Sequence, residues 1–276
     1  MKKGFISFAM ALLSVLIPAA EIAAGYPVIP EAGEHFEIYS IEGTAGSVTG
    51  QRWVNMLAWR EQARVLAQRY RDIVFVNMDP ADNAVYLTFD DGPDTANTVK
   101  VMSILKEYGV TATFFFTGSN IERHPAVVKQ AHDAGFAIGL HSCSHARMTE
   151  LTEDEILSEL NRNNDLLETA TGARSGIMRP PFGALGDREI EIIDNSGLRI
   201  YLWSIDTLDW AQSDPSEILR NIKDYIRPGD IILMHSGPGQ SKSAEILPSV
   251  IEFIRDAGYE MRALPVTAPP SSCYQN

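Results

Sequence analysis

The hydrophobic and polar positions alternate in a regular way from about residue 85 to residue 263. Short apolar runs typical of buried strands are separated by segments whose apolar residues recur at helical spacing. The predicted strands are 85–89, 111–116, 137–140, 176–178, 199–203, 230–234 and 259–263. The predicted helices are 98–108, 125–134, 152–171, 187–196, 215–225 and 243–256. This βα alternation predicts a parallel sheet covered by helices.

Local signals mark the ends of several of these helices. Thr152 and Glu155 have the spacing of a capping box, and Asp214 precedes Pro215 at another predicted helix start. A glycine follows four of the helices and precedes the next strand, at Gly109, Gly135, Gly197 and Gly258. Glycine commonly ends a helix in the left-handed conformation, so these positions support the predicted boundaries.

Both an open doubly wound sheet and a barrel fit this alternation. No Gly-x-Gly-x-x-Gly sequence follows the first strand, which disfavours a dinucleotide-binding fold. Polar side chains instead follow several different strands, as they do at the C-terminal rim of a (β/α) barrel. We therefore expect an α/β barrel with its functional site at that rim.

The segments before and after the alternation divide the chain further. Residues 26–45 are rich in Pro, Gly and Glu and indicate a loosely held arm. Residues 51–70 have the pattern of an amphipathic helix that packs on the main domain. Its apolar stripe consists of Trp53, Leu57, Val65, Leu66 and Tyr70. We expect an N-terminal arm at 26–84, a main domain at 85–265 and a tail at 266–276.

The first 25 residues have the pattern of an export signal. Lys2 and Lys3 precede an apolar stretch, and small residues follow at 19–25. Pro18 and the modest length of the stretch argue against an ordinary membrane-spanning helix. An uncleaved anchor is the alternative. In either case we expect the rest of the chain to be secreted or to lie at the cell surface.

Composition and charge are those of a soluble globular protein. Of the 276 residues, 45% are hydrophobic and 21% are charged. The formal net charge is −13, so neither nucleic acid nor anionic lipid is expected as the main partner. Cys143 and Cys273 are the two cysteines. In an oxidising compartment they can form one disulfide, and the alternative is a buried Cys143 with a free thiol in the tail.

Candidate chemistry begins at the end of the first strand of the alternation. Asp90 and Asp91 follow an apolar run and precede Gly92 and Pro93, which turn the chain. Two adjacent carboxylates at the end of a buried strand are costly unless a cation compensates their charge. The turn can bring both carboxylates towards one centre, and a solvated turn is the structural alternative.

Two histidines, His141 and His145, directly follow the strand 137–140. Their imidazoles can converge in a helical turn or in a tight loop. With Asp91 they form a set of two imidazoles and one carboxylate, which is typical of a catalytic metal with open coordination positions. Capping of the next helix is the alternative role for such a pair.

Three later strand ends carry further candidates. Arg179 precedes two stiff prolines that can hold its guanidinium against a carboxylate in a bidentate pair. Asp209 and Trp210 follow the fifth strand, and His235 ends the sixth. Each has a structural alternative, namely a surface Arg in a rigid turn, a packed Trp and a satisfied core His. Their common position at strand ends favours a functional interpretation.

Five segments in this order resemble the motifs of the polysaccharide deacetylase family, carbohydrate esterase family 4. They are 88–91, 141–145, 179–183, 206–210 and 233–235. The resemblance spans about residues 85–263 and implies a distorted (β/α)7 barrel with its helices outside. It also implies that residues 85–265 are a catalytic domain that removes acetyl groups from sugars with the help of a divalent metal.

The resemblance further implies a metal-binding and a proton-accepting role. Asp91, His141 and His145 would bind the metal, usually zinc, with other divalent transition metals as alternatives. Asp90 would be the general base, and Arg179 would keep it ionised. Each of these roles is an expectation carried over from the family's motifs.

The remaining motif residues would serve the leaving group and the substrate. His235 would be the general acid, with Asp209 orienting it and raising its pKa. The backbone N–H of Phe182 would donate to the oxyanion, and Phe182 stands where Tyr is common in the family. The substrate and the acetyl group would contact Pro180, Trp210 and Leu233. Cys143 lies inside the histidine motif, where its redox state could perturb the metal.

The resemblance implies N-acetylglucosamine residues of peptidoglycan or a chitin-like polymer as the substrate. The intact Asp90–Asp91 pair followed by Gly-Pro is more similar to the N-acetylglucosamine branch than to the N-acetylmuramic acid branch, which often alters this motif. An O-acetyl esterase on xylan or an N-acetylmuramic acid deacetylase would use the same site. A catalytically silent wall-binding protein is the alternative from another class, and the complete set of candidate catalytic residues argues against it.

Overall fold

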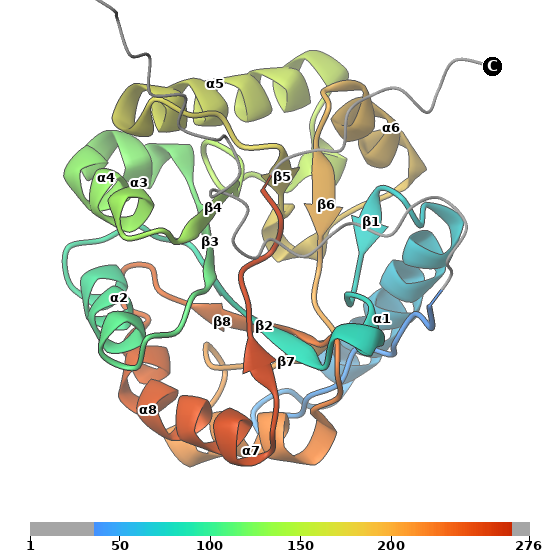
Figure 1. The fold of residues 1–276 in the computed structure, drawn as a ribbon. Coiled ribbons are helices and arrows are strands. Elements are labelled where there is room, and N and C mark those ends of the chain that lie inside the picture. Colours follow the sequence, from blue (N-terminus) through green and yellow to red (C-terminus); the bar gives the residue numbers. More distant parts are fainter. Residues whose placement is uncertain (1–35, 267–276) are drawn as a thin grey trace, which may run out of the picture.

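The computed structural model describes residues 36–266. The predicted export signal, the start of the arm and Cys273 lie outside the described residues. Figure 1 shows the strands near the centre of the molecule and the helices arranged around them. Within residues 36–266, none of the helices combines the length and the apolar character needed to span a membrane.

The strands form one curled parallel sheet. Their order is β1-β6-β5-β4-β3-β2-β8-β7, and β9 also pairs with β2. The strands are β1 (Val74–Phe75), β2 (Ala84–Asp90), β3 (Thr113–Phe116), β4 (Ala137–Leu140), β5 (Ile177–Met178), β6 (Arg199–Tyr201), β7 (Ile205–Asp206), β8 (Ile231–His235) and β9 (Glu260–Met261). Every strand pair is parallel. This arrangement confirms the predicted α/β fold of the distorted barrel type.

Helices cover the outside of the sheet (Figure 1). They are α1 (Gln51–Arg69), α2 (Asn97–Glu107), α3 (Gly118–Arg123), α4 (Pro125–Asp133), α5 (Glu153–Thr171), α6 (Asp187–Asn195), α7 (Pro215–Tyr225) and α8 (Ser241–Asp256). The capping box of Thr152 and Glu155 is present at α5, and Asp214 caps α7. Gly109, Gly135, Gly197 and Gly258 all have positive φ after their helices. These predicted helix boundaries are confirmed.

Strands β1 and β7 and the short helix α3 were not predicted from the sequence. The predicted strand 199–203 is shorter, because the chain leaves β6 after Tyr201 and forms β7 at Ile205–Asp206, which pairs with β8 instead. A continuous apolar run gives no sign of this change of partner. Strand β1 pairs with β6, so the sheet begins before Val85. Short 3-10 turns occupy Pro80–Asp82, Met148–Glu150 and Pro181–Gly183.

The predicted helix α1 is present, but its predicted apolar stripe is partly wrong. Leu57 and Val65 are 45% and 38% exposed. The buried face instead consists of Arg60, Ala63, Leu66 and Ala67. Small side chains let α1 approach the domain closely, and Arg60 donates to the backbone carbonyl of Gly43 at 2.9 Å. A buried arginine with a carbonyl partner cannot be recognised from hydrophobic periodicity.

The centre of the sheet is formed by β2, in which every residue is buried. Aromatic side chains of β2 and β3 stack beside one another, with Phe89 and Phe114 ring centroids 5.3 Å apart. A rigid apolar layer therefore lies under the strand ends. Four residues after those ends have positive φ, in the left-handed region: Asp91, Ser142, His145 and Phe182.

Candidate active site

The predicted site residues meet at the carboxyl ends of the strands. Asp90 ends β2 and lies in register with His235, the last residue of β8. His141 follows β4, and Arg179 follows β5. Because the carboxyl ends of parallel neighbours lie at one edge of a sheet, residues far apart in the chain are brought together there.

Asp91, His141 and His145 offer three ligand atoms within 4.8 Å of one another. Asp91 Oδ1 lies 3.4 Å from His141 Nε2 and 3.1 Å from His145 Nε2. His141 is buried, whereas the side chains of His145 and Asp91 are 33% and 26% exposed. The cluster is therefore closed on the side of His141 and open on the side of His145 and Asp91, where substrate or water can reach it.

The donor set fits a divalent transition metal. Asp91 Oδ1 is buried and has no hydrogen-bond donor within the described residues, so a cation would satisfy it. His141 Nδ1 lies 2.8 Å from the Arg179 carbonyl oxygen. Since a carbonyl can only accept, Nδ1 carries the hydrogen and Nε2 presents its lone pair to the cluster. The pKa of Asp91 is lowered: burial raises it, but the two nearby imidazoles outweigh burial.

Asp90 forms a buried ion pair with Arg179. The guanidinium is completely buried, and its Nη1 donates to Asp90 Oδ1 at 2.7 Å and to Thr88 Oγ1 at 2.8 Å. Its other nitrogens donate to the carbonyls of Tyr201 and Leu202. The predicted bidentate pairing with a carboxylate is therefore wrong, because the strand-end carbonyls take the remaining donors. Asp90 Oδ2 lies 3.8 Å from His141 Nε2.

Asp209 and His235 form a second buried pair. Asp209 Oδ1 lies 2.7 Å from His235 Nδ1, and Asp209 Oδ2 accepts from the His235 backbone N–H at 2.8 Å. Burial lowers the pKa of His235, but the charge and hydrogen bond of Asp209 outweigh it and raise the pKa to about 10. Burial likewise raises the pKa of Asp209, and His235 brings it below its usual range. His235 therefore carries a proton at neutral pH.

Ser243 completes this pair and was not predicted from the sequence. It lies on α8, is 1% exposed, and its hydroxyl donates to Asp209 Oδ2. Asp209 Oδ1 also accepts from the backbone N–H of Trp210 at 3.0 Å. Four donors thus surround one carboxylate. No pattern near Ser243 marks it, because its partner lies 34 residues earlier in the chain.

The residues predicted to contact substrate differ in their exposure. Trp210 and Phe182 are 52% and 53% exposed, whereas Leu233 is 3% exposed and Pro180 is buried. The Phe182 ring meets the His145 ring edge-on, with centroids 4.7 Å apart. On this rim, the two aromatic side chains therefore present the apolar surface that a sugar ring could contact.

The N-terminal helix α1 supports the turn that carries Phe182. Trp59 Nε1 donates to the Gly183 carbonyl at 2.9 Å, and its ring lies 5.0 Å from that of Trp203. Gly183 has φ +60°, and a Cβ there would lie 2.4 Å from the Trp59 ring. No chemistry is predicted for this helix from its sequence, and in the structure it makes a supporting contact to the site.

The other predicted feature of this region is Cys143. It lies between the two histidines, is 5% exposed, and contacts Gly118. Burial raises the pKa of its thiol. Its predicted disulfide partner, Cys273, is outside the described residues, so the pairing stays a prediction.

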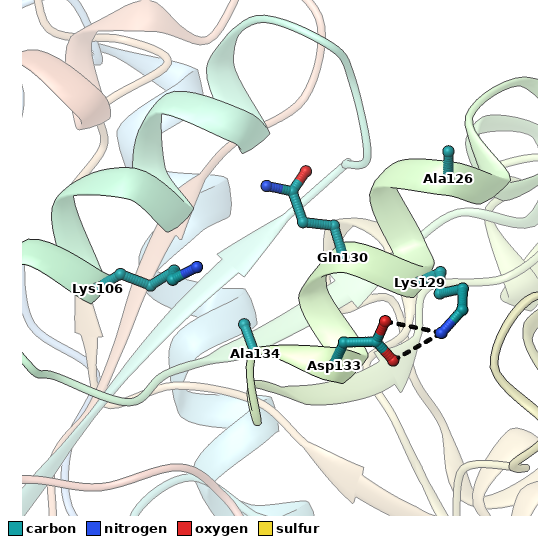
Figure 2. Close-up of a pocket in the computed structure, with 6 residues that line it drawn as sticks. All are labelled: Lys106, Ala126, Lys129, Gln130, Asp133 and Ala134. Carbon is teal, nitrogen blue, oxygen red and sulfur yellow. Dashed lines mark hydrogen bonds and ion pairs between the residues drawn. The ribbon is translucent and has the colours of Figure 1, made fainter.

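A cavity of about 380 Å³ lies elsewhere on the surface, between α2 and α4. Figure 2 shows Lys106 and Gln130 facing it, and Lys129 paired with Asp133 at 2.7 Å. The last turns of α2 and α4 lead into the amino ends of β3 and β4, so this cavity is at the opposite end of the sheet from the site. It shares no residue with the candidate site.

Comparison with known proteins places this geometry in a family. The family model for polysaccharide deacetylase matches residues 77–201. A peptidoglycan-N-acetylglucosamine deacetylase of Bacillus cereus is 34% identical over 183 residues, which are 66% of this chain and 66% of that protein. The chain thus spans about two thirds of the length of this relative.

Two solved structures have the same fold. The Bc1960 peptidoglycan N-acetylglucosamine deacetylase is 31% identical, with a TM-score of 0.70 over 72% of this chain and 94% of that one. A carbohydrate esterase family 4 pseudoenzyme of Bacillus anthracis is 29% identical, with a TM-score of 0.65 over 69% of this chain and 66% of that one. Sequence, fold and rim geometry agree, and this chain belongs to the polysaccharide deacetylase family.

Proposed function

We propose that this protein is a metal-dependent hydrolase that removes N-acetyl groups from N-acetylglucosamine residues of a peptidoglycan or chitin-like polysaccharide. The observation that carries the proposal is the convergence of Asp91, His141 and His145 beside Asp90 and His235. The Bacillus cereus relative bears the name of a deacetylase of this type. Because a pseudoenzyme has a similar fold, the fold alone does not establish catalysis, and the proposal depends on these residues.

Zinc is the metal we expect in this site. Two imidazoles and one carboxylate are a common zinc ligand set, and they leave coordination positions open. When bound, the metal would polarise the acetyl carbonyl and acidify a water molecule. Asp91, His141 and His145 would hold it, and the open side of the cluster would admit the acetyl group.

Asp90 would act as the general base. Arg179 engages its Oδ1, which leaves Oδ2 beside His141 Nε2 to accept a proton from water. The buried ion pair fixes the carboxylate in place, so little reorganisation is needed at the moment of proton transfer. A positioned base of this kind typically contributes about 100-fold to 10,000-fold in rate.

His235 would act as the general acid for the departing amine. Its Nδ1 is held by Asp209, so its Nε2 would donate the proton. The raised pKa keeps the imidazolium form populated at neutral pH. The backbone N–H of Phe182 would donate to the developing oxyanion, an interaction worth about 3 kcal/mol in comparable sites. Trp210 and the Phe182 ring would contact the sugar.

The polysaccharide substrate also bears on where the enzyme works. We propose that residues 1–25 direct export, so that the domain acts outside the cytoplasm. Cell walls and chitin-like polymers lie there, and the first 25 residues have the pattern of an export signal. Sequencing the N-terminus of the extracellular protein would test export and cleavage, and a protein retained in the cytoplasm would contradict the proposal.

An activity panel tests the proposed reaction. Acetate release would be measured on N-acetylated chito-oligomers, peptidoglycan and acetylxylan, with the metal content determined in parallel. We expect release from an N-acetylglucosamine polymer, loss of release with a chelator, and recovery on adding zinc. Release from acetylxylan alone would identify an O-acetyl esterase, and release from N-acetylmuramic acid residues alone would identify the other deacetylase branch.

The variant Asp90→Asn separates catalysis from binding. It keeps the shape of the side chain but removes the base, so we expect acetate release to fall at least 100-fold while zinc still binds. Undiminished release would reject Asp90 as the base. If the wild-type protein binds the polymer and zinc but releases no acetate from any substrate, the silent wall-binding alternative holds.

A further inference from the structure

The loop that carries the two histidines is held in an unfavourable backbone conformation. Ser142 has φ +55° and His145 has φ +62°, although neither is glycine. Left-handed residues of this kind persist only where surrounding contacts fix them. The contacts around the loop, defined here as 141–145, therefore decide where the His141 and His145 imidazoles lie.

Two neighbouring elements hold the carbonyl groups of this loop. The first backbone N–H groups of α3 donate to it, from Gly118 to the Ser142 carbonyl at 3.0 Å and from Ser119 to the Cys143 carbonyl at 2.8 Å. Asn163 of α5 donates from Nδ2 to the same Ser142 carbonyl at 2.6 Å. These bonds fix one side of the loop only.

The N–H groups of the loop are bound by one carboxylate. Glu159 Oε2 accepts from the backbone N–H of Cys143 at 2.8 Å and of Ser144 at 2.7 Å. Glu159 Oε1 accepts from the Ser144 hydroxyl at 2.9 Å. Cys143 and Ser144 are the two residues immediately before His145. A single half-buried side chain thus closes three charge-assisted hydrogen bonds onto the segment between the ligand histidines.

We propose that Glu159 is a positioning residue for the metal centre, which holds the loop so that His141 and His145 converge with Asp91. This inference rests on the proposed function in that the cluster binds a metal. Glu159 contacts neither imidazole, so it acts through the backbone. Its place on α5, one turn before Asn163, lets the helix hold both the N–H and the carbonyl groups of the loop.

Zinc affinity of the full chain tests the proposal. Zinc would be removed with a chelator and returned in competition with a chromophoric chelator, and the melting temperature of the metal-free protein would be recorded. We expect Glu159→Gln to weaken zinc binding about 10-fold or more, the range typical of outer residues that orient ligands. Glu153→Gln, an exposed residue of the same helix, removes the same charge and should bind zinc like the wild type.

Glu159→Asp separates position from charge. It keeps the carboxylate but withdraws it from the loop, so a positioning role predicts weakened zinc binding and a melting temperature close to that of the wild type. Wild-type affinity in Glu159→Asp, or in Glu159→Gln, would overturn the proposal. A wild-type protein that binds no zinc would overturn the metal site of the proposed function as well, so the two failures are distinguishable.

Discussion

Buried charges at the rim differ in how well they are compensated. Asp90 has Arg179 at 2.7 Å, and Asp209 has His235 at 2.7 Å. Asp206 is equally buried, yet within residues 36–266 its Oδ1 accepts only from the Leu208 backbone N–H at 3.0 Å. Burial therefore raises the pKa of Asp206 to about 6, and the charge of Arg60 offsets this only in part. One carboxylate of the site region thus works against stability.

This imbalance predicts how Asp206→Asn changes stability. The pKa of about 6 lies above the ordinary value of 3.8, so the protonated side chain stabilises the fold below pH 4. That stabilisation, about 3 kcal/mol, is lost as the pH rises through 6. Asn keeps the hydrogen bond without the charge. We expect the variant to be about 1–3 kcal/mol more stable than the wild type at pH 8 and equal to it at pH 4. Urea unfolding at both pH values measures this, and equal destabilisation at both would contradict it.

Ser243 should tune the general acid through Asp209. Removing its hydroxyl leaves the buried carboxylate with one donor fewer, so the pKa of Asp209 rises and that of His235 falls. In the proposed mechanism, activity requires protonated His235 and is lost as the pH rises through the pKa of this histidine. Ser243→Ala should therefore move the basic limb of the pH–kcat profile to lower pH by about one unit.

The exposed Ser249→Ala on the same helix is the matched control for this profile. It should leave both limbs unchanged. A Ser243→Ala enzyme whose rate falls equally at every pH would show that the hydroxyl serves only packing, and it would reject the tuning role.

At the scale of elements, the short helix α3 contacts both segments that carry the proposed metal ligands. Its Asn120 donates to the Asp91 carbonyl at 2.7 Å, and its first N–H groups bind the histidine loop. Gly118 opens the helix, and a Cβ there would lie 2.8 Å from Cys143 Sγ and 3.0 Å from Cys143 Cα. This approach leaves no room for a side chain.

Gly118→Ala should therefore push α3 away from the histidine loop. Overpacking of this kind costs about 1–3 kcal/mol, which we expect to appear as a lower free energy of unfolding. Zinc affinity should fall with it, because the loop moves. Gly46→Ala is the control, since a Cβ there has no atom within 4 Å. Unchanged stability and zinc affinity in Gly118→Ala would mean that the helix is not a fixed support.

The elements also show what periodicity can predict. The apolar runs that precede Asp90, His141 and His235 gave the strands and their ends, since each run is bounded by polar residues or glycine. Helix α3 was missed because six residues give too little periodicity, and β7 because a strand of two residues gives no alternation to recognise. Such short elements depend on tertiary contacts rather than on local pattern.

At the scale of the molecule, the parallel topology explains why the candidate metal ligands could be predicted from the sequence but the residues that support them could not. Strand ends of parallel neighbours share one edge, so residues after them converge whatever their separation in the chain. Ser243, Glu159 and Trp59 reach the site from outer helices instead. No rule of spacing relates a helix position to a strand end across the fold. These residues could therefore be identified only from the structure.

The same convergence should couple metal binding to global stability. Asp91, His141 and His145 come from loops after β2 and β4, and they form one cluster only in the folded chain. A metal that binds the native state alone stabilises it by about 2.7 kcal/mol at 100 times its Kd. For a domain of this size, about 2–4 °C per kcal/mol gives a rise in Tm of roughly 5–10 °C on adding zinc.

In His145→Ala the cluster loses one proposed ligand, so the metal-free Tm of the variant should be near that of the wild type and the zinc-dependent rise should be largely absent. Differential scanning calorimetry with and without zinc measures both quantities, and an equal rise in the wild type and the variant would mean that the metal binds elsewhere.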